Sequence, residues 1–297
     1  MRAFSPKRIH EILNRNQYGL KGVPSKRNAV NIEGYPLLNV GDSLGPAIVS
    51  WMLEGRGLDP AARVEKTGHL MTVGSIVSFG LFDAVIWGSG IRDPKAPRII
   101  RQKKKYLHRR FDIRAVRGPL TRKALLDSGY SCPAVYGDPA ILMPLIYPAE
   151  NHGKGQEIGV ILHYKTAIAQ ASGGNGAERL LPVPDALTHP YHLRFIDPRT
   201  TDYKTFIDAI CRSKLVISSS LHGIILAEAY GIPAIFLNFG VDEQQTKYED
   251  WYLSTNRKTA FCTSLDDALR ANAPPLPELS AMRRELMACF PYDLWEE

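Results

Sequence analysis

The chain has little of what marks secreted or membrane-spanning proteins. Its 297 residues include only four cysteines, which are widely separated and form neither a Cys-x-x-Cys pair nor a spacing typical of metal ligands. Free thiols in a reducing compartment are therefore expected, not a disulfide framework. The first residues lack the apolar core of a signal peptide, and the longest apolar runs are too short to cross a bilayer. We predict a cytoplasmic protein that can also lie peripherally on the inner face of the membrane.

Internal repeats and low-complexity tracts are also absent, and the 44% hydrophobic content is typical of a globular protein with a full core. The chain does carry an excess of positive charge, with a formal net charge of +7. This balance favours anionic partners such as phosphorylated metabolites or an anionic membrane surface. We expect no nucleic-acid partner, because no nucleic-acid-binding module and no aromatic interleaving accompany the basic residues.

Short apolar runs typical of buried parallel strands alternate with helical segments in the first half of the chain. Two of these runs, Leu70–Val73 and Ala84–Trp87, end in small residues, Gly74-Ser75 and Gly88-Ser89-Gly90. Small residues at strand ends let a ligand or a helix approach the backbone closely. A further strand is expected at Asp112–Val116.

Several helix starts carry recognisable first residues. Asp42 is placed to cap a helix over Ser43–Glu54, and Pro119 is placed to begin a helix that ends near Ser128. In the second half, Ser264 is placed to cap another helix. The first half therefore predicts an alternation of strand and helix, which is typical of an α/β fold.

A Pro- and Gly-rich stretch, Pro144–Gly155, interrupts this alternation. The pattern restarts with an expected strand at Ile158–His163, and a polar, Gly-rich loop is expected at Ala171–Ala177. We therefore predict two domains, residues 1–150 and residues 151–297.

The most informative segment is Leu215–Asn238, LVISSSLHGIILAEAYGIPAIFLN. It predicts a strand, a serine turn, an apolar helix, a Gly-Ile-Pro turn and a second strand. Such a unit implies parallel strands, and ligands bind at the carboxyl ends of strands in these sheets. Ser218, Ser219 and Ser220 fall at that end. His222 follows beside the free N–H groups of the helix start, so we predict an anion site with a titratable side chain.

Four short motifs occur in order along the chain. They are Asn39-x-Gly41-Asp42, Trp87-Gly88-Ser89-Gly90, Arg117 followed by a helix and by Gly137-Asp138-Pro139, and Ser220-Leu221-His222 with Gly231-Ile232-Pro233 downstream. Each motif is weak alone, but the four in this order resemble the polysaccharide pyruvyl transferase family over most of the chain.

The resemblance implies an α/β fold with two Rossmann-like lobes in a GT-B-like arrangement and a cleft between the domains. The N-terminal lobe would take the acceptor side, and the C-terminal lobe would contribute His222 and the helix start of the donor site. The implied activity is transfer of pyruvate from phosphoenolpyruvate to a sugar of a polysaccharide or lipid-linked oligosaccharide precursor, as a ketal. Phosphoenolpyruvate is then the donor substrate, and no metal or other cofactor is required.

This chemistry needs cations for two anionic groups and a group that transfers protons. We predict that His222 transfers the proton and that Arg117 contacts the donor, because a guanidinium binds carboxylate or phosphate through two hydrogen bonds. Further substrate contacts are predicted for Ser218, Ser219, Ser220, Asp42, Gly88, Ser89, Gly90 and Asp138. Each of these two residues has a structural alternative. His222 would only cap the start of its helix or lie satisfied in the core, and Arg117 would be an ordinary surface arginine. For Asp42 the alternative is helix capping, and for Asp138 it is fixing a turn.

One position departs from the family pattern. The family often has an arginine that contacts phosphoenolpyruvate two residues before the histidine, where this chain has Ser220. Either another cation takes over, with Arg92 and Arg212 as candidates, or the donor site differs.

The stretch Arg98–Arg110, RIIRQKKKYLHRR, holds seven Lys and Arg in thirteen residues. Such a run is most often a solvated face. The functional alternative is contact with an anionic membrane surface or a lipid-linked pyrophosphate acceptor.

Two other functions stay open at this point. One is a GT-B glycosyltransferase that uses a nucleotide sugar, because Glu228-Ala229-x-Gly231-x-Pro233 resembles the segment in which a glutamate holds the donor ribose. For Glu228 itself the alternatives are an ion pair with a core arginine, which is the structural role we favour, and a contact with an acceptor sugar hydroxyl. The other function is a non-catalytic membrane-surface or scaffold protein, which rests only on the basic run.

Overall fold

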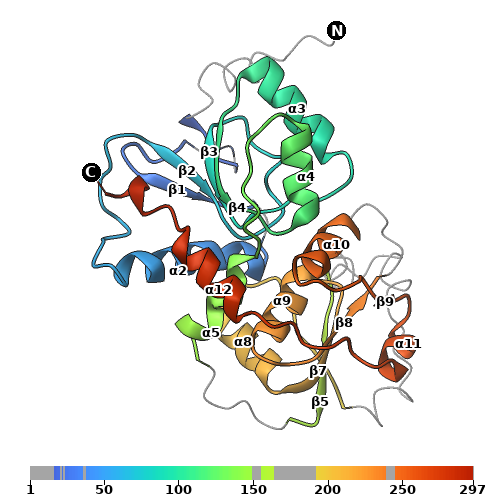
Figure 1. Ribbon diagram of the computed structural model, residues 1–297. Coiled ribbons are helices and arrows are strands. Elements are labelled where there is room, and N and C mark those ends of the chain that lie inside the picture. Colours follow the sequence, from blue (N-terminus) through green and yellow to red (C-terminus); the bar gives the residue numbers. More distant parts are fainter. Residues whose placement is uncertain are drawn as a thin grey trace.

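The structure, a computed structural model, describes residues 17–20, 22, 24–35, 38–148, 155–163, 192–238 and 245–296. It contains two parallel β-sheets, one above the other in Figure 1. The upper sheet has the order β1-β2-β3-β4, and all of its neighbouring strands run parallel. Its strands are β1 (Val30–Glu33), β2 (Gly68–Met71), β3 (Ala84–Trp87) and β4 (Phe111–Ala115).

The second sheet has the order β6-β5-β7-β8-β9, and its neighbouring strands are also parallel. Its strands are β5 (Glu157–Ile161), β6 (Leu193–Phe195), β7 (Ser213–Ser218), β8 (Ala234–Leu237) and β9 (Phe261–Cys262). The predicted α/β fold with parallel sheets is therefore confirmed. The predicted boundary near residue 150 lies at positions outside the described residues, as does the loop predicted at Ala171–Ala177.

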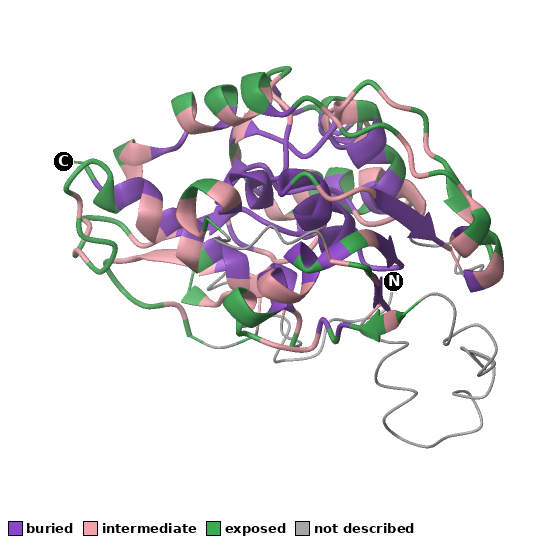
Figure 2. Cartoon of the chain, turned by 90° about the horizontal axis from the view of Figure 1, so that it is seen from below, coloured by how far each residue is buried: buried purple, intermediate pink, exposed green. Residues whose placement is uncertain are grey.

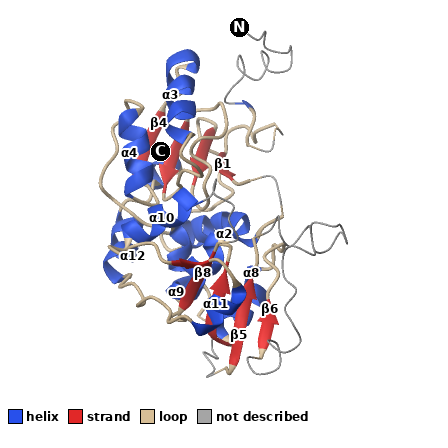
Figure 3. Ribbon diagram, turned by 90° about the vertical axis from the view of Figure 1, so that its right-hand side faces the viewer, coloured by secondary structure: helices blue, strands red, loops and turns tan. Residues whose placement is uncertain are grey.

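Helices pack between and around the two sheets, with α2, α10 and α12 in the layer between them (Figure 3). The α-helices are α2 (Val40–Glu54), α3 (Ala96–Leu107), α4 (Pro119–Asp127), α5 (Met143–Ile146), α8 (Tyr203–Cys211), α9 (Leu221–Ala229), α10 (Gln245–Ser254), α11 (Leu265–Arg270) and α12 (Ser280–Ala288). Two short 3-10 helices are η2 (Pro139–Leu142) and η4 (Tyr292–Leu294). Among the described helices, none has the length and apolar character needed to cross a membrane.

The helix starts correct one sequence prediction and confirm another. Helix α2 begins at Val40, and its N-cap is Asn39, whose side chain accepts a hydrogen bond from the Gly41 N–H. Asp42 is therefore in the first turn and not at the cap, where its negative charge still favours the positive helix start. Ser264 caps α11 as predicted, because its hydroxyl accepts from the backbone N–H three residues on.

One strand also differs from its prediction. The strand predicted at Leu70–Val73 is β2, Gly68–Met71, which lies two residues earlier. Strand β2 ends at Met71, and the chain then turns at Gly74, whose φ of +106° favours glycine. The residues after β2 therefore form a loop and not the end of a strand.

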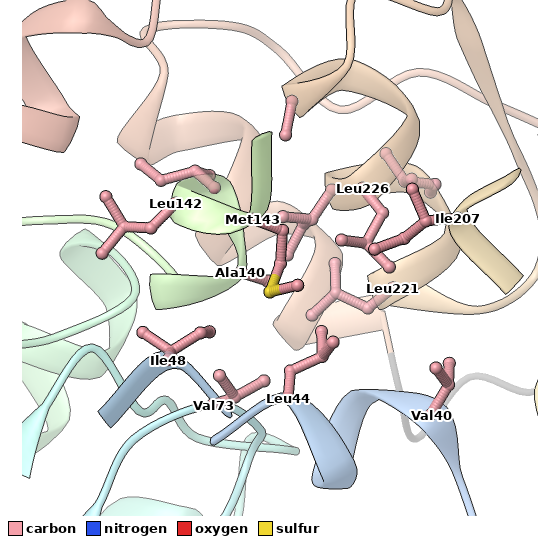
Figure 4. Packing of buried hydrophobic residues seen from close by; sticks show 14 of the residues in the cluster. Val40, Leu44, Ile48, Val73, Ala140, Leu142, Met143, Ile207, Leu221 and Leu226 are labelled. Atoms are coloured by element: carbon pink, nitrogen blue, oxygen red, sulfur yellow. The ribbon is translucent and has the colours of Figure 1, made fainter. Parts of the chain in front are cut away.

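A single apolar cluster joins the two sheets. Buried side chains of α2, η2, α5, α8 and α9 meet in it, as Figure 4 shows for Leu44, Ile48, Leu142, Ile207 and Leu226. Figure 2, which colours the whole chain by burial, shows buried segments in the interior and exposed ones around the rim. The burial of this shared apolar surface stabilises the relative position of the two halves.

The end of the chain returns to the first sheet. Trp87 Nε1 donates a hydrogen bond of 2.9 Å to the backbone carbonyl of Leu286 in α12. Arg283 Nε donates to the Ile141 carbonyl at 2.9 Å, and its Nη2 donates to the Ala229 carbonyl at 2.8 Å. Helix α12 therefore ties η2 to the end of α9.

A tight contact behind β3 generates the first prediction. Gly88 and Gly231 both have positive φ, +85° and +76°. A Cβ added at Gly88 would collide with the Pro139 ring, whereas nothing lies within 4 Å of one added at Gly231. Gly231→Ala should therefore lose only about 1 kcal/mol of stability from backbone strain. Gly88→Ala should lose about 1–3 kcal/mol more from overpacking, as measured by urea unfolding. Equal losses in the two variants would contradict the importance of this contact.

Candidate functional site

A pocket lies where the N-terminal ends of α2 and α9 come together. Its wall takes residues from both halves of the chain. They are Tyr35, Asn39, Asp42, Gly74, Ser75, Ile76, Phe79 and Arg92 from the first half, and His163, Ser220, Leu221, His222 and Lys247 from the second. Three of the predicted site residues, Asp42, Ser220 and His222, thus line one pocket although they are distant in sequence.

The serine turn before α9 is held by its own hydrogen bonds. Ser218 Oγ accepts from the Ser220 N–H at 3.0 Å and donates to the Ser220 carbonyl at 2.8 Å. Ser219 Oγ accepts from the His163 N–H at 2.7 Å. Ser220 is the N-cap residue of α9, but its side chain makes no capping hydrogen bond. The first two serines therefore fix the turn, and only Ser220 lines the pocket.

His222 sits in the first turn of α9 and is 7% exposed. Its ring packs on Gly41 of α2, where an added Cβ would collide with Nδ1. The other ring nitrogen, Nε2, lies 3.7 Å from Asp138 Oδ2. Neither of these two buried atoms has a hydrogen-bond partner among the described residues.

Asp138 lies behind the pocket and caps η2. Its Oδ1 accepts a hydrogen bond of 3.0 Å from the Ala140 N–H, so the predicted turn role is confirmed. The other oxygen of the same carboxylate, Oδ2, faces His222, and a contact of Asp138 with substrate stays a prediction. The structure therefore brings the Asp-Pro motif and the Leu-His motif together.

Arg117 has a different environment from the one predicted. It is completely buried, and its Nη2 lies 3.1 Å from Asp250 Oδ2 of α10 in an ion pair with no exposure on either side. The guanidinium also donates to Ser75 Oγ at 2.6 Å and to the Ile91 carbonyl at 2.6 Å. The surface alternative is thus wrong, and Arg117 is not among the residues that line the pocket. A direct contact between Arg117 and the donor stays a prediction. In the structure Arg117 reaches the pocket only indirectly, by its hydrogen bond to Ser75, which lines the pocket.

The glycine-rich turn after β3 supports the pocket from behind. Ser89 Oγ donates a hydrogen bond of 2.8 Å to the Gly74 carbonyl, and the Gly90 N–H donates to the same carbonyl at 3.0 Å. Gly90 also leaves the space that the Arg117 guanidinium fills. Gly88 makes room for Pro139, as described above. The predicted residues Gly88, Ser89 and Gly90 therefore position other groups, and the turn after β2 lines the pocket instead.

Arg92 and Lys247 are the Lys and Arg side chains among the described lining residues. Of the two cations proposed to replace the family arginine, Arg92 lines the pocket, whereas Arg212 is exposed at the C-terminal end of α8. Sequence reasoning missed Lys247, because α10 has a weak apolar pattern and no motif marks it.

Asp42 contributes a carboxylate whose oxygens accept from the Tyr35 N–H at 3.0 Å and from Asn39 Nδ2 at 3.2 Å.

Glu228 is buried, and its carboxylate is fully engaged. Its two oxygens accept from Arg257 Nη1 at 2.6 Å and Nη2 at 2.8 Å, and from Trp251 Nε1 at 2.8 Å. Glu228 does not line the pocket. This is the structural role that the sequence gave as the alternative to holding a nucleotide ribose.

The geometry places a polar pocket at two helix starts, and comparison with known proteins shows the family to which the chain belongs. Residues 80–239, more than half of the chain, match the family model for polysaccharide pyruvyl transferase. The chain belongs to this family. The matched residues include Arg117, Asp138 and His222.

Two curated relatives show similarity at the level of sequence. The succinoglycan biosynthesis protein ExoV of Rhizobium meliloti is 27% identical over 190 residues, which are 64% of this chain and 49% of the relative. The chain thus spans about half the length of ExoV. An uncharacterised protein of Acanthamoeba polyphaga mimivirus is 27% identical over 218 residues, 69% of this chain and 67% of that protein. A crystal structure of a functionally uncharacterised Klebsiella pneumoniae protein has a TM-score of 0.46 at 13% identity, covering 88% of this chain and 100% of that chain.

The buried ion pair generates the second prediction. Arg117→Ala should destabilise the ligand-free protein by about 3–5 kcal/mol, because it leaves Asp250 as an unpaired buried charge. Arg199→Ala removes a more exposed pair with Asp197 and should cost at most about 1 kcal/mol. Urea unfolding measures both. Adding Asp250→Asn to Arg117→Ala should recover part of the loss, and a small loss for Arg117→Ala alone would contradict a structural role.

Proposed function

We propose that the protein transfers pyruvate from phosphoenolpyruvate to a sugar of a polysaccharide or lipid-linked oligosaccharide precursor, forming a ketal. The observation that carries this proposal is the pocket in which His222 lies at a helix start with Arg92 and Lys247 in the same wall. Membership of the pyruvyl transferase family supports the reaction class. The named role of ExoV in succinoglycan biosynthesis supports a glycan acceptor.

The proposed donor is an anion at both ends, and the pocket offers matching groups. A guanidinium at Arg92 can bind a carboxylate or phosphate through two hydrogen bonds, and Lys247 adds a second positive charge. The first N–H groups of α9 are not capped by the Ser220 hydroxyl, and with the helix dipole they favour an anion. Donor binding is therefore assigned to this side of the pocket.

The chemical steps then follow from the electron demand of the enol phosphate. Protonated His222 gives its proton to the methylene carbon, and the central carbon becomes electrophilic. The oxygen of one sugar hydroxyl forms a bond to that carbon, the carbon–oxygen bond to phosphate breaks, and a second hydroxyl closes the ketal. Of the two hydroxyl protons, one replaces the proton that His222 gave up, and the other leaves with the phosphate. Asp42 lines the same pocket and is placed to accept a hydrogen bond from the acceptor.

We assign the acceptor to the first half of the chain and the donor to the start of α9 in the second half, with Arg92 reaching the donor from the first half. The two sheets then correspond to the lobes of a GT-B-like arrangement that meet near residue 150. The pocket is the inner part of the cleft between them. The shared apolar cluster and the Arg117–Asp250 pair would restrict relative motion of these lobes.

The third prediction concerns His222 and Arg92. His222→Asn should lower turnover by roughly two to four orders of magnitude, because the proton donor is lost, with little change in donor affinity. Arg92→Ala should instead weaken phosphoenolpyruvate binding by roughly tenfold or more, because it removes a charge-assisted contact. Phosphate release and isothermal titration measure the two effects.

The matched control is Arg212→Ala, which removes an exposed arginine outside the pocket lining and should change neither quantity. Near-normal turnover in His222→Asn would restrict this histidine to a structural role at the helix start. A thermal shift with UDP- or GDP-sugars but none with phosphoenolpyruvate would overturn the choice of donor.

We also propose that α3 contacts the anionic inner face of the cytoplasmic membrane, where a lipid-linked acceptor would be found. Its exposed face carries Arg98, Arg101 and Lys105, together with Tyr106 at 68% exposure. The rest of the basic run is engaged elsewhere. Lys103 Nζ donates to the Ser78 and Gly80 carbonyls at 2.8 and 2.7 Å, and Arg109 is buried. Charge complementarity with anionic lipid is therefore limited to the outer face of the helix.

The fourth prediction tests this face. Arg98→Gln with Lys105→Gln should weaken binding to phosphatidylserine vesicles on the order of 30-fold at low salt, because each surface cation contributes about 1 kcal/mol. Lys258→Gln with Arg284→Gln removes two exposed cations of the second half and is the charge-matched control. Co-sedimentation at two salt concentrations measures binding. Equal binding by the two double variants would leave α3 as a solvated face.

A further inference from the structure

Two polar atoms behind the pocket have no hydrogen-bond partner among the described residues, and they face each other. Asp138 Oδ2 and His222 Nε2 are both buried, and 3.7 Å separates them. A buried carboxylate oxygen without a partner is unfavourable, and folded proteins rarely keep one without a reason. The distance is too long for a hydrogen bond but suits an ion pair, so the imidazole is the group that this carboxylate serves.

The backbone around Asp138 prevents its carboxylate from turning away. Its Oδ1 is held by the Ala140 N–H at 3.0 Å. Gly137 before it has a φ of +142°, and Pro139 after it packs into the space left by Gly88. The second carboxylate oxygen is therefore fixed toward α9.

The imidazole is equally restricted. The His222 ring is 9% exposed as a side chain and packs on Gly41 at the start of α2. Its Nδ1, Cε1 and Cγ atoms lie on the side toward Gly41, while Nε2 lies toward Asp138. The other charged or titratable side chains that line the pocket with it are Tyr35, Asp42, Arg92, His163 and Lys247.

We propose that Asp138 is a positioning residue that holds the N–H of neutral His222 on Nε2 and stabilises the protonated ring. Nδ1 is then the nitrogen that exchanges a proton with the substrate. The contact shortens when the ring is charged, since such hydrogen bonds are often long without substrate and tighten in the complex. The exchange of a proton between Nδ1 and the substrate rests on the proposed function. The assignment of the proton of neutral His222 to Nε2 does not depend on that function.

The test measures the tautomer directly. Protein labelled with 15N-histidine is studied by long-range proton–nitrogen correlation at a pH where the ring is neutral, and the His222 signal is assigned by its absence in His222→Gln. The wild type should show the proton on Nε2. Asp138→Asn, whose amide can donate to Nε2, should shift the signal toward the Nδ1-protonated form.

Turnover gives a second readout. Asp138→Asn should lower kcat by roughly 100-fold or more while the KM for phosphoenolpyruvate changes by less than about threefold. Asn and Ser keep the oxygen that caps η2, so Asp138→Ser serves as a second variant if Asp138→Asn does not fold. Asp202→Asn, at the aspartate that caps α8 through the Thr205 N–H, is the matched control and should change neither readout.

A wild-type proton on Nδ1, or a tautomer unchanged in both Asp138 variants, would overturn the proposal. A failure of the proposed function has a different signature. In that case the wild type would release no phosphate from phosphoenolpyruvate, while the dependence of the tautomer on Asp138 would remain.

Discussion

The buried ion pair between Arg117 and Asp250 is the constraint on which the two halves of the molecule depend. Arg117 follows β4 of the first sheet, and Asp250 belongs to α10 of the second half. Asp250 also accepts from the N–H groups of Leu120 and Thr121, so it binds the start of α4 as well as the guanidinium. Removing one partner of such a pair leaves the other as a buried charge without its counterion. The pair also serves the pocket, because Arg117 holds Ser75 and Lys247 lies one helical turn before Asp250.

The loop after β2, which supplies Ser75, Ile76 and Phe79 to the pocket, is fixed by cations bound to its carbonyls. Arg109 donates to the Phe79 carbonyl at 2.7 Å, and Lys103 donates to those of Ser78 and Gly80. Burial lowers the pKa of Arg109 to about 10, which still leaves the side chain charged at neutral pH. Part of the basic run thus shapes the pocket wall from inside, and the remainder faces solvent on α3.

Three glycines let bulky side chains pack directly against the backbone and so position the groups in and behind the pocket. Gly41 admits the His222 ring, Gly88 admits Pro139 and Gly90 admits the Arg117 guanidinium. Any side chain at these three positions would push apart groups that must meet. These glycines explain why two of the motifs that resemble the family are rich in glycine although Gly88 and Gly90 do not line the pocket. Their role is to let α2, η2 and α9 converge on one histidine.

The sequence by itself determined the parallel α/β class, most strands and helices, the family, and the place of His222 at a helix start. These features depend on residues close together in the chain, such as the alternation of apolar runs and the caps of helices. Only the tertiary structure decided that Arg117 pairs with Asp250, that Asp138 faces His222, and that Arg92 and Lys247 share a pocket. Those relations arise because the two sheets bury one shared apolar cluster, and no local pattern records which distant side chains that packing brings together.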